Sequence, residues 1–239
     1  PRADLILTEE GLKLKMDFLE GFKTGGIRLP KEYHNEERIQ KGLLVDAVLG
    51  QYDRTPWNIM FTEKEEWGSD VAFIDNGASL FSRARGGHKG FPEHFTVDEL
   101  KEILSNPQFE GEPVNEAYHS LVEVKKGKVK IKSKKGWLKG LLNDFNDRIN
   151  QYVISDAIDQ SGFPDGQRSI KVLKERVEGL EKELAVLPKY SRYHRMTVSA
   201  IDTYKKAIEA GGEATYLKKA LIQRKDDIVE IFSEALRNS

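Results

Sequence analysis

The chain contains no cysteine, and this absence excludes disulfides, thiolate zinc sites and a cysteine nucleophile. Its five histidines are scattered without the paired spacing of metal ligands, so we do not expect zinc chemistry. No apolar run approaches the roughly 18 residues of a membrane helix. The N-terminus, PRADLILTEEG, lacks the basic and then apolar layout of a secretion signal. We therefore expect a cytoplasmic protein with at most peripheral membrane contact.

The sequence also has no excess of positive or negative charge. The 239 residues carry 38 Lys plus Arg against 39 Asp plus Glu, which gives a net charge of −1. Such balance is typical of an ordinary soluble globular protein, and the length allows one large core or two modest ones. Because the chain lacks the basic excess of a nucleic-acid binder, we expect no specific nucleic-acid partner.

The first third of the chain combines short strands with one helix. LILTEE and LKLKMDFLEG alternate apolar and polar residues on either side of Gly11, which predicts a hairpin or two neighbouring strands. Apolar residues at helical spacing predict a helix over 35–49, closed by Gly50. Two apolar runs, NIMF and VAFID, flank a turn at Gly68 and Ser69 and predict a second small hairpin.

The remainder is expected to be mainly helical. Thr96 followed by Glu99 fits a capping box and starts a helix to Leu104. The segment LVEVKKGKVKIKSKKG predicts a basic hairpin that turns at Gly127. Longer amphipathic helices are expected over 137–160, 169–187, 191–210 and 215–236. The predicted fold class is therefore α+β and mainly helical, with a helical bundle at the C-terminal end.

Three polar residues stand in the order of a kinase metal site. Asp53 is followed by Asn58 five positions on, and Asp75 comes after an apolar run and before Gly77. In kinases the first Asp orients the attacking hydroxyl, while the Asn and the second Asp hold magnesium against the ATP phosphates. Asp and Asn also gather in turns for backbone reasons, so the alternative interpretation is a pair of turns flanking a hairpin.

The same residues carry a resemblance to a known family. DRTPWN and IDNG resemble the catalytic motifs of the phosphatidylinositol 3- and 4-kinase superfamily, most of all those of the type II phosphatidylinositol 4-kinases. MDFLEGFK resembles the hinge strand of that family, and RIQKGLLVDAVLGQYDR resembles the helix that delivers its catalytic loop. The likeness covers about residues 12–105, with specific motifs only within 51–80.

The resemblance implies a kinase, a transferase that depends on ATP and Mg²⁺ and acts on a lipid headgroup or a protein hydroxyl. It makes Asp53 the catalytic residue and Asn58 and Asp75 the magnesium ligands, with Arg54 and Gly77 structural near the site. It also implies three parts of the chain. These are hinge-like strands in 1–22, a kinase-like C-terminal lobe in 23–135, and a helical region in 136–239 packed on or beside that lobe.

The loop SRARGGHKGFPEHF corresponds in this resemblance to the activation loop, which governs substrate choice in these kinases. Its basic side chains could meet an anionic substrate such as a lipid headgroup; they are Arg83, Arg85, His88 and Lys89. Exposed Lys and Arg are common on protein surfaces, so the alternative is a solvated charged loop.

The sequence departs from the family pattern before the hinge. Only the 11 residues PRADLILTEEG precede it, and they contain no lysine that could pair with the ATP phosphates. Either a longer form of the chain or a second chain supplies the N-terminal lobe, or the lineage has lost phosphate transfer. The alternative function is therefore a non-catalytic kinase-like binding or structural module.

Two basic segments fall outside these motifs. Seven lysines lie between Lys125 and Lys135, where they either meet an anionic surface or keep an exposed edge hairpin soluble. The cluster KYSRYHR, from Lys189 to Arg195, combines aromatic and basic residues at an expected helix connection. It could bind a partner, but the sequence alone assigns it no role.

Overall fold

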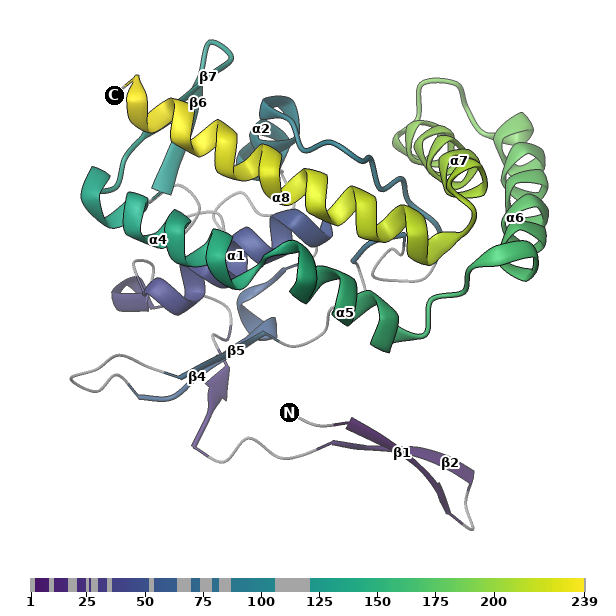
Figure 1. Ribbon diagram of the computed structural model, residues 1–239, viewed down its shortest axis with the longest axis horizontal. Helices are drawn as coiled ribbons and strands as arrows, with labels where there is room; N and C mark the ends of the chain where they lie inside the picture. The colour runs from purple at the N-terminus through teal and green to yellow at the C-terminus, as the bar shows by residue number, and fades with distance from the viewer. Residues whose placement is uncertain are drawn as a thin grey trace.

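The computed structural model describes residues 3–8, 11–16, 21–24, 26, 30–33, 36–51, 54–63, 70–73, 79–81, 87–105 and 121–238 (Figure 1). These residues form a mainly helical molecule with small antiparallel sheets. The predicted α+β, mainly helical class is confirmed at this level.

Three small antiparallel sheets contain the described strands. Their bounds are β1 Ala3–Thr8, β2 Gly11–Met16, β3 Lys23–Thr24, β4 Ile59–Phe61, β5 Val71–Phe73, β6 Val122–Lys125 and β7 Lys128–Ile131. The predicted hairpins β1–β2, β4–β5 and β6–β7 are all present, and β1–β2 stands apart from the rest of the ribbon in Figure 1. The two-residue strand β3, which pairs with β4, was not predicted because it is too short to show a period.

The helices account for most of the described chain. Their bounds are α1 Glu37–Leu49, α2 Val97–Ser105, α4 Lys135–Arg148, α5 Gln151–Ser161, α6 Gly166–Val186, α7 Arg192–Ala210 and α8 Glu213–Arg237. Short 3-10 helices cover Lys31–Tyr33 and Pro56–Asn58. The helices predicted over 35–49, 169–187, 191–210 and 215–236 are confirmed to within three residues at each end.

The single helix predicted over 137–160 is wrong, because the structure divides it into α4 and α5. Asn150 causes the break. Its side-chain Oδ1 accepts hydrogen bonds from the backbone N–H of Tyr152 at 3.0 Å and of Val153 at 3.2 Å. An Asn that caps a new helix stabilises its first turn, and here that interaction competes with continuation of the preceding helix.

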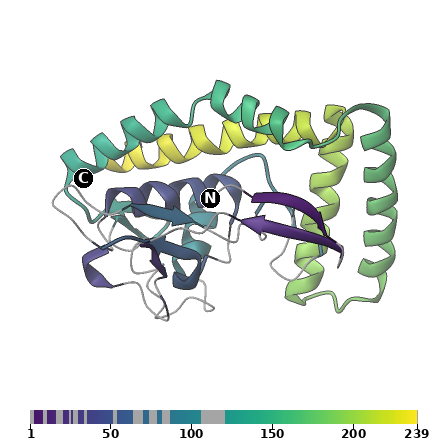
Figure 2. The same ribbon diagram turned by 90° about the horizontal axis from the view of Figure 1, so that it is seen from below.

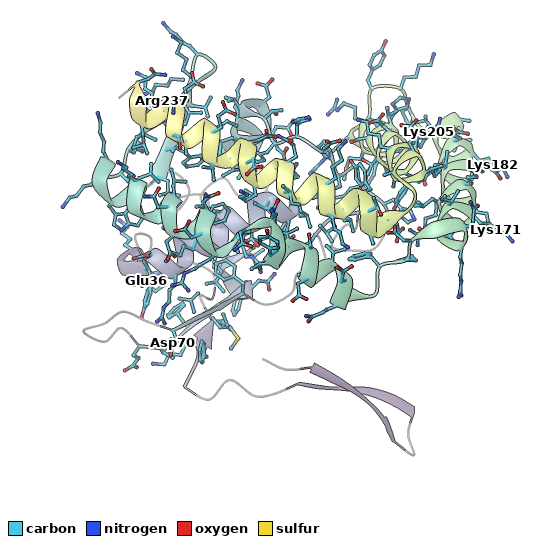
Figure 3. The ribbon with its side chains drawn as sticks, in the orientation of Figure 1. Glu36, Asp70, Lys171, Lys182, Lys205 and Arg237 are labelled. Carbon is cyan, nitrogen blue, oxygen red and sulfur yellow. The ribbon has the colours of Figure 1, made fainter. Side chains whose placement is uncertain are left out.

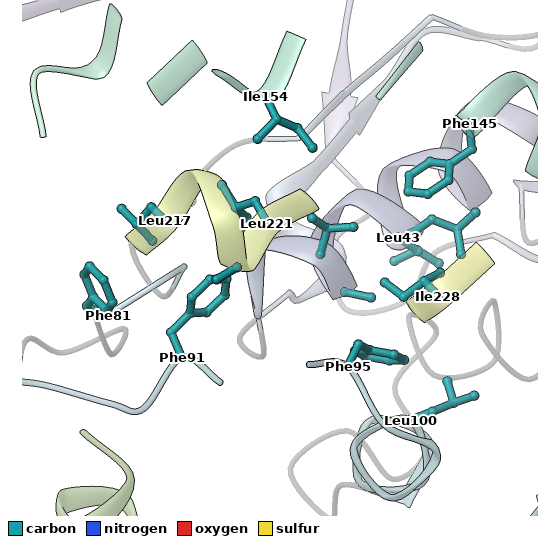
Figure 4. Close-up of a cluster of buried hydrophobic side chains, with 14 of the residues drawn as sticks. Leu43, Phe81, Phe91, Phe95, Leu100, Phe145, Ile154, Leu217, Leu221 and Ile228 are labelled. Carbon is teal, nitrogen blue, oxygen red and sulfur yellow. The ribbon is translucent and has the colours of Figure 1, made fainter. Parts of the chain in front are cut away.

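Helix α8 organises the core. It packs against α1, α4, α5 and α7 and against β7, and Figure 2 shows it lying alongside α4 and α5 above α1. Figure 4 shows buried side chains from these elements gathered around it, among them Leu43, Phe145, Leu221 and Ile228. Full burial of each such side chain stabilises the fold by about 1.5–3 kcal/mol.

Helices α6 and α7 form an antiparallel pair at one end of the molecule (Figure 2). Asp165, just before α6, caps α8, because its carboxylate accepts hydrogen bonds from the backbone N–H and the hydroxyl of Thr215 at 3.1 and 2.6 Å. The pair is thereby fixed to the start of α8. Within the described chain, no helix is both long enough and apolar enough to cross a bilayer.

Candidate functional site

The candidate site begins where α1 ends. Gly50 adopts a left-handed conformation with φ 61°, which glycine reaches without a steric penalty. Its backbone N–H donates to the carbonyl of Ala47 at 3.3 Å, and the N–H of Gln51 donates to the carbonyl of Asp46 at 2.8 Å. This is the Schellman arrangement of a helix C-terminus. It turns the chain sharply into the segment that carries the predicted catalytic motif.

Arg54, inside that motif, is held by a buried carboxylate of α1. Its Nε and Nη2 atoms donate to the two carboxylate oxygens of Asp46 at 2.8 and 2.9 Å, and both side chains are buried. Burial raises the pKa of Asp46, and the bonded guanidinium of Arg54 opposes that increase. The two-point geometry fixes both the position and the orientation of the loop relative to α1.

The remaining contacts of Arg54 extend across the site. Its Nη1 donates to the backbone carbonyl of Asn58 at 3.2 Å, and its guanidinium lies over the ring of Phe73 in β5, 4.9 Å from the centroid. One side chain therefore connects α1, the loop before β4, and β5. These contacts hold the backbone of the loop and the side chains around it in place.

Asn58 lies at the end of the short helix Pro56–Asn58, directly before β4. Its backbone N–H donates to the carbonyl of Thr55 at 3.0 Å, and its carbonyl accepts from Arg54. Its half-buried side-chain amide has no hydrogen-bond partner among the described residues. The backbone of Asn58 is thus fixed, while its amide oxygen is available to a ligand.

The pairing of β4 and β5 places Asn58 at a defined end of the hairpin. Ile59 pairs with Phe73, and Phe61 pairs with Val71. Asn58 therefore stands at the end where the chain leaves β5. Asp70, labelled in Figure 3, precedes β5 at the opposite end. Its exposed side chain forms an ion pair with Arg38.

Helix α1 lies close against this hairpin. A Cβ atom added at Gly42 would lie 2.2 Å from two ring atoms of Phe73, closer than real atoms approach. Gly42 therefore lets the ring that supports Arg54 pack directly on α1.

Most of the other predicted site residues lie outside the described residues. These are Asp53, Asp75, Gly77, Arg83 and Arg85. Their predicted roles in catalysis, magnesium binding, structural support near the site and substrate binding stay predictions. Within the part of the chain that the structure describes, no group of three His, Asp or Glu side chains is placed to hold a metal ion.

The two described residues of the predicted substrate-binding set have contacts inside the molecule. Lys89 is buried, and its Nζ donates to the backbone carbonyl of Gly50 at the end of α1. The Nδ1 atom of His88 lies 2.5 Å from the hydroxyl of Tyr204 in α7. Burial raises the pKa of Tyr204 to about 12, so its phenol stays protonated and can donate to His88.

The segment after His88 is anchored to α7 and α8. The backbone N–H of Phe91 donates to the hydroxyl of Thr203 at 2.9 Å, and the hydroxyl of Tyr216 donates to the carbonyl of Phe91 at 2.7 Å. Gly90 lies so close to α7 that an added Cβ would come within 1.8 Å of the Ser199 hydroxyl oxygen. The end of the predicted activation loop is therefore fixed to the C-terminal helices.

Arg224 of α8 also holds the end of α1, and no short motif in the sequence predicts this role. It is fully buried, and its guanidinium binds the carboxylate of Glu99 as well as the backbone carbonyls of Ala47 at 2.7 Å and Val48 at 2.9 Å. It thus stabilises the C-terminal turn of α1, from which the candidate site starts. One signal was available, because Arg224 falls on the apolar face that Leu217, Leu221 and Ile228 define at helical spacing.

Comparison of the chain with protein-family models, with curated proteins and with solved structures found no match.

Proposed function

We propose that the chain belongs to a phosphotransferase of the phosphoinositide-kinase-like fold, which uses ATP and Mg²⁺ to phosphorylate a lipid headgroup or a protein hydroxyl. The observation that carries the proposal is the fixed position of Asn58, between a helix end and the end of the hairpin where the chain leaves β5. In protein kinases the Asn of the catalytic loop holds a magnesium ion, and Asn58 has the corresponding place in the motif.

The connectivity of the chain supports the proposal that Asp53, Asn58 and Asp75 lie close together. Asp53 is covalently attached to Arg54, whose side chain is fixed by Asp46. Asp75 follows Phe73 by two residues, a reach of at most about 7 Å, and Phe73 pairs with the residue after Asn58. Both carboxylates are therefore expected near the available amide of Asn58.

The chemistry of these side chains fits magnesium. Mg²⁺ prefers oxygen ligands and commonly takes one or two carboxylates together with substrate phosphates. The amide oxygen of Asn58 and the carboxylate of Asp75 would hold the ion, which when bound neutralises the charge on the ATP phosphates. The anchored backbone of Asn58 keeps its amide in one position before any ligand arrives.

The reaction assigns a separate role to Asp53. Its carboxylate would orient the acceptor hydroxyl and take up its proton as the hydroxyl oxygen bonds to the γ-phosphorus of ATP. The bond from that phosphorus to the bridging oxygen breaks, and ADP leaves. Arg54 would hold the site residues in position and take no part in the reaction, because its guanidinium is occupied by Asp46, Asn58 and Phe73.

Transfer of labelled phosphate from ATP tests the proposal. The protein, in the longest form that its gene encodes, is assayed with phosphoinositide vesicles and with a generic protein substrate. We expect magnesium-dependent transfer that falls by at least about a hundredfold in Asp53→Ala and in Asp75→Ala, since each removes a group that acts in the transition state.

Asp70→Ala is the matched control, because Asp70 is an exposed carboxylate at the other end of the same hairpin. It should transfer phosphate like the wild type. Equal turnover in Asp75→Ala and the wild type rejects the assignment. No transfer under any condition favours the alternative, a non-catalytic kinase-like binding or structural module.

A further inference from the structure

The connection between α6 and α7 exposes an unusual set of side chains. Val186, Tyr190 and Tyr193 are 81%, 92% and 60% exposed. The segment 186–195, here termed the α6–α7 tip, lies at the far end of the helix pair (Figures 1 and 2). Large apolar side chains on a projecting surface indicate a contact with another apolar phase or partner.

This exposure belongs to an ordered turn. The backbone N–H of Ser191 donates to the carbonyl of Pro188 at 2.9 Å, and the side chain of Ser191 caps α7 by accepting from the N–H of His194 at 3.0 Å. Both bonds hold the turn in one conformation. The tip therefore presents its aromatic and aliphatic groups on a fixed scaffold, which lowers the entropic cost of binding.

The charge around the two tyrosines is positive, whereas exposed Glu183 lies three residues before Val186. Lys189, Arg192 and Arg195 are exposed, and the sequence from Leu187 to Ile201 contains no Asp or Glu. Another exposed apolar pair, Tyr152 and Val153 on α5, lies in a helix that also carries Asp156 and Asp159. A positive surround thus distinguishes the two tyrosines of the tip from the exposed tyrosine of α5.

The β6–β7 turn is a second basic projection. The β6–β7 turn and the α6–α7 tip both reach the upper edge of the molecule in Figure 1. The turn carries the exposed residues Lys125, Lys126 and Lys128, while Val129 and Ile131 of the same hairpin pack against the core. A flat anionic surface along this edge would therefore meet both basic projections.

A lipid bilayer that contains anionic lipids fits this surface best. Tyrosine side chains favour the boundary between headgroups and acyl chains, and each Lys or Arg near an anionic leaflet adds to the attraction. An aliphatic residue such as Val186 also gains from contact with acyl chains, whereas it gives nothing to base stacking. The balanced charge of the whole chain also argues against nucleic acid as the partner.

We infer that the α6–α7 tip docks the protein on anionic membranes, with the β6–β7 turn as a second point of contact. Helix α7 begins at this tip and also binds the end of the predicted activation loop through Tyr204 and Thr203. Docking would therefore hold the end of that loop at a fixed orientation to the bilayer. The preference for a lipid headgroup over a protein substrate rests on the proposed function, whereas the docking itself does not.

Flotation with phosphatidylcholine vesicles, with and without phosphatidylserine, tests the inference. The wild type should float with phosphatidylserine vesicles in low salt and dissociate in high salt. Lys189→Ala should weaken this partition about fivefold, because each cation near the surface contributes about that factor. The double variant Tyr190→Ser, Tyr193→Ser should weaken it further.

Two controls match these changes elsewhere in the helices. Tyr152→Ser removes a tyrosine whose exposed fraction lies between those of Tyr190 and Tyr193 from an acidic helix, and Lys171→Ala removes an exposed lysine near the other end of α6 (Figure 3). Both should bind like the wild type, and unchanged melting temperatures should show that all variants fold.

Equal flotation of the tip variants and the wild type overturns the inference, as does binding to single-stranded RNA without binding to vesicles. Tip-dependent flotation without phosphate transfer supports docking and rejects only the proposed function.

Discussion

At the scale of single residues, the contact between Arg54 and Asp46 fixes the loop that leads to Asn58. Both side chains are buried, and the guanidinium has further partners in Asn58 and Phe73. A buried ion pair adds little net stability over an apolar pair of similar size, but removal of one partner leaves an uncompensated charge. The pair therefore specifies the position of the loop more than it stabilises the whole molecule.

Loss of either partner should be costly. Arg54→Met and Asp46→Leu should each lower the free energy of unfolding by about 3–5 kcal/mol, whereas the double variant should recover much of that loss. Chemical denaturation of the four proteins measures the coupling. Lys205→Ala is a control for an exposed pair, with Glu181, and should cost under about 1 kcal/mol. Losses that simply add in the double variant would contradict the account.

The role of a residue could be predicted from the sequence when its partners lie nearby in the chain. The closure of α1 by Gly50 could be read directly, since Gly50 directly follows the last apolar residues of the helix. The partner of Arg54 lies eight positions away on α1, and the partner Glu99 of Arg224 lies 125 positions away. No local pattern specifies such pairs, because they depend on how whole helices pack.

At the scale of elements, the approach of α1 to β5 determines the shape of the candidate site. Gly42 makes it possible, because any Cβ there would overlap the ring of Phe73. That ring in turn lies under the guanidinium of Arg54. A change in the contact between Gly42 and Phe73 should therefore shift the side chain of Arg54, and with it the backbone of Asn58.

Glycine-to-alanine substitutions in two helices test this contact. Gly42→Ala should lower the free energy of unfolding by about 1–3 kcal/mol through overpacking. Gly140→Ala in α4, where an added Cβ meets no atom within 4 Å, should raise it by about 0.5–1 kcal/mol through helix propensity. Thermal and chemical melts of both variants measure the difference. Equal stabilisation by the two substitutions would show that α1 and β5 are not in close contact.

Helices and hairpins were predicted well where periodicity and turn residues agreed. Gly127, with φ 71°, turns the β6–β7 hairpin as predicted. The hydroxyl of Thr96 accepts from the backbone N–H of Glu99 at 3.1 Å, which is one half of the expected capping box, while the Glu99 carboxylate binds Arg224. The break at Asn150 was missed because the apolar spacing continues across it into α5. A side-chain cap inside a periodic pattern cannot be recognised from periodicity alone.

At the scale of the whole molecule, α8 couples the C-terminal helices to the candidate site. Arg224 binds the end of α1 and Glu99 of α2, and Tyr216 holds Phe91 of the predicted activation segment. The region 136–239 therefore forms one core with the described part of 23–135, as the buried cluster around α8 shows (Figure 4). A ligand held at Asn58 should accordingly stabilise the molecule as a unit.

Thermal unfolding in the presence of ATP and Mg²⁺ tests the central claim, that Asn58 and Asp75 together hold a magnesium nucleotide. At a ligand concentration of about 100 Kd, binding stabilises the native state by about 2.7 kcal/mol. For a chain of this size that corresponds to a rise of about 5–10 °C in melting temperature. We predict this rise for the wild type and Asp70→Ala when both ATP and Mg²⁺ are present, and its loss in Asn58→Ala and Asp75→Ala. An unchanged melting temperature in the wild type, or an equal rise in all four proteins, would contradict the claim.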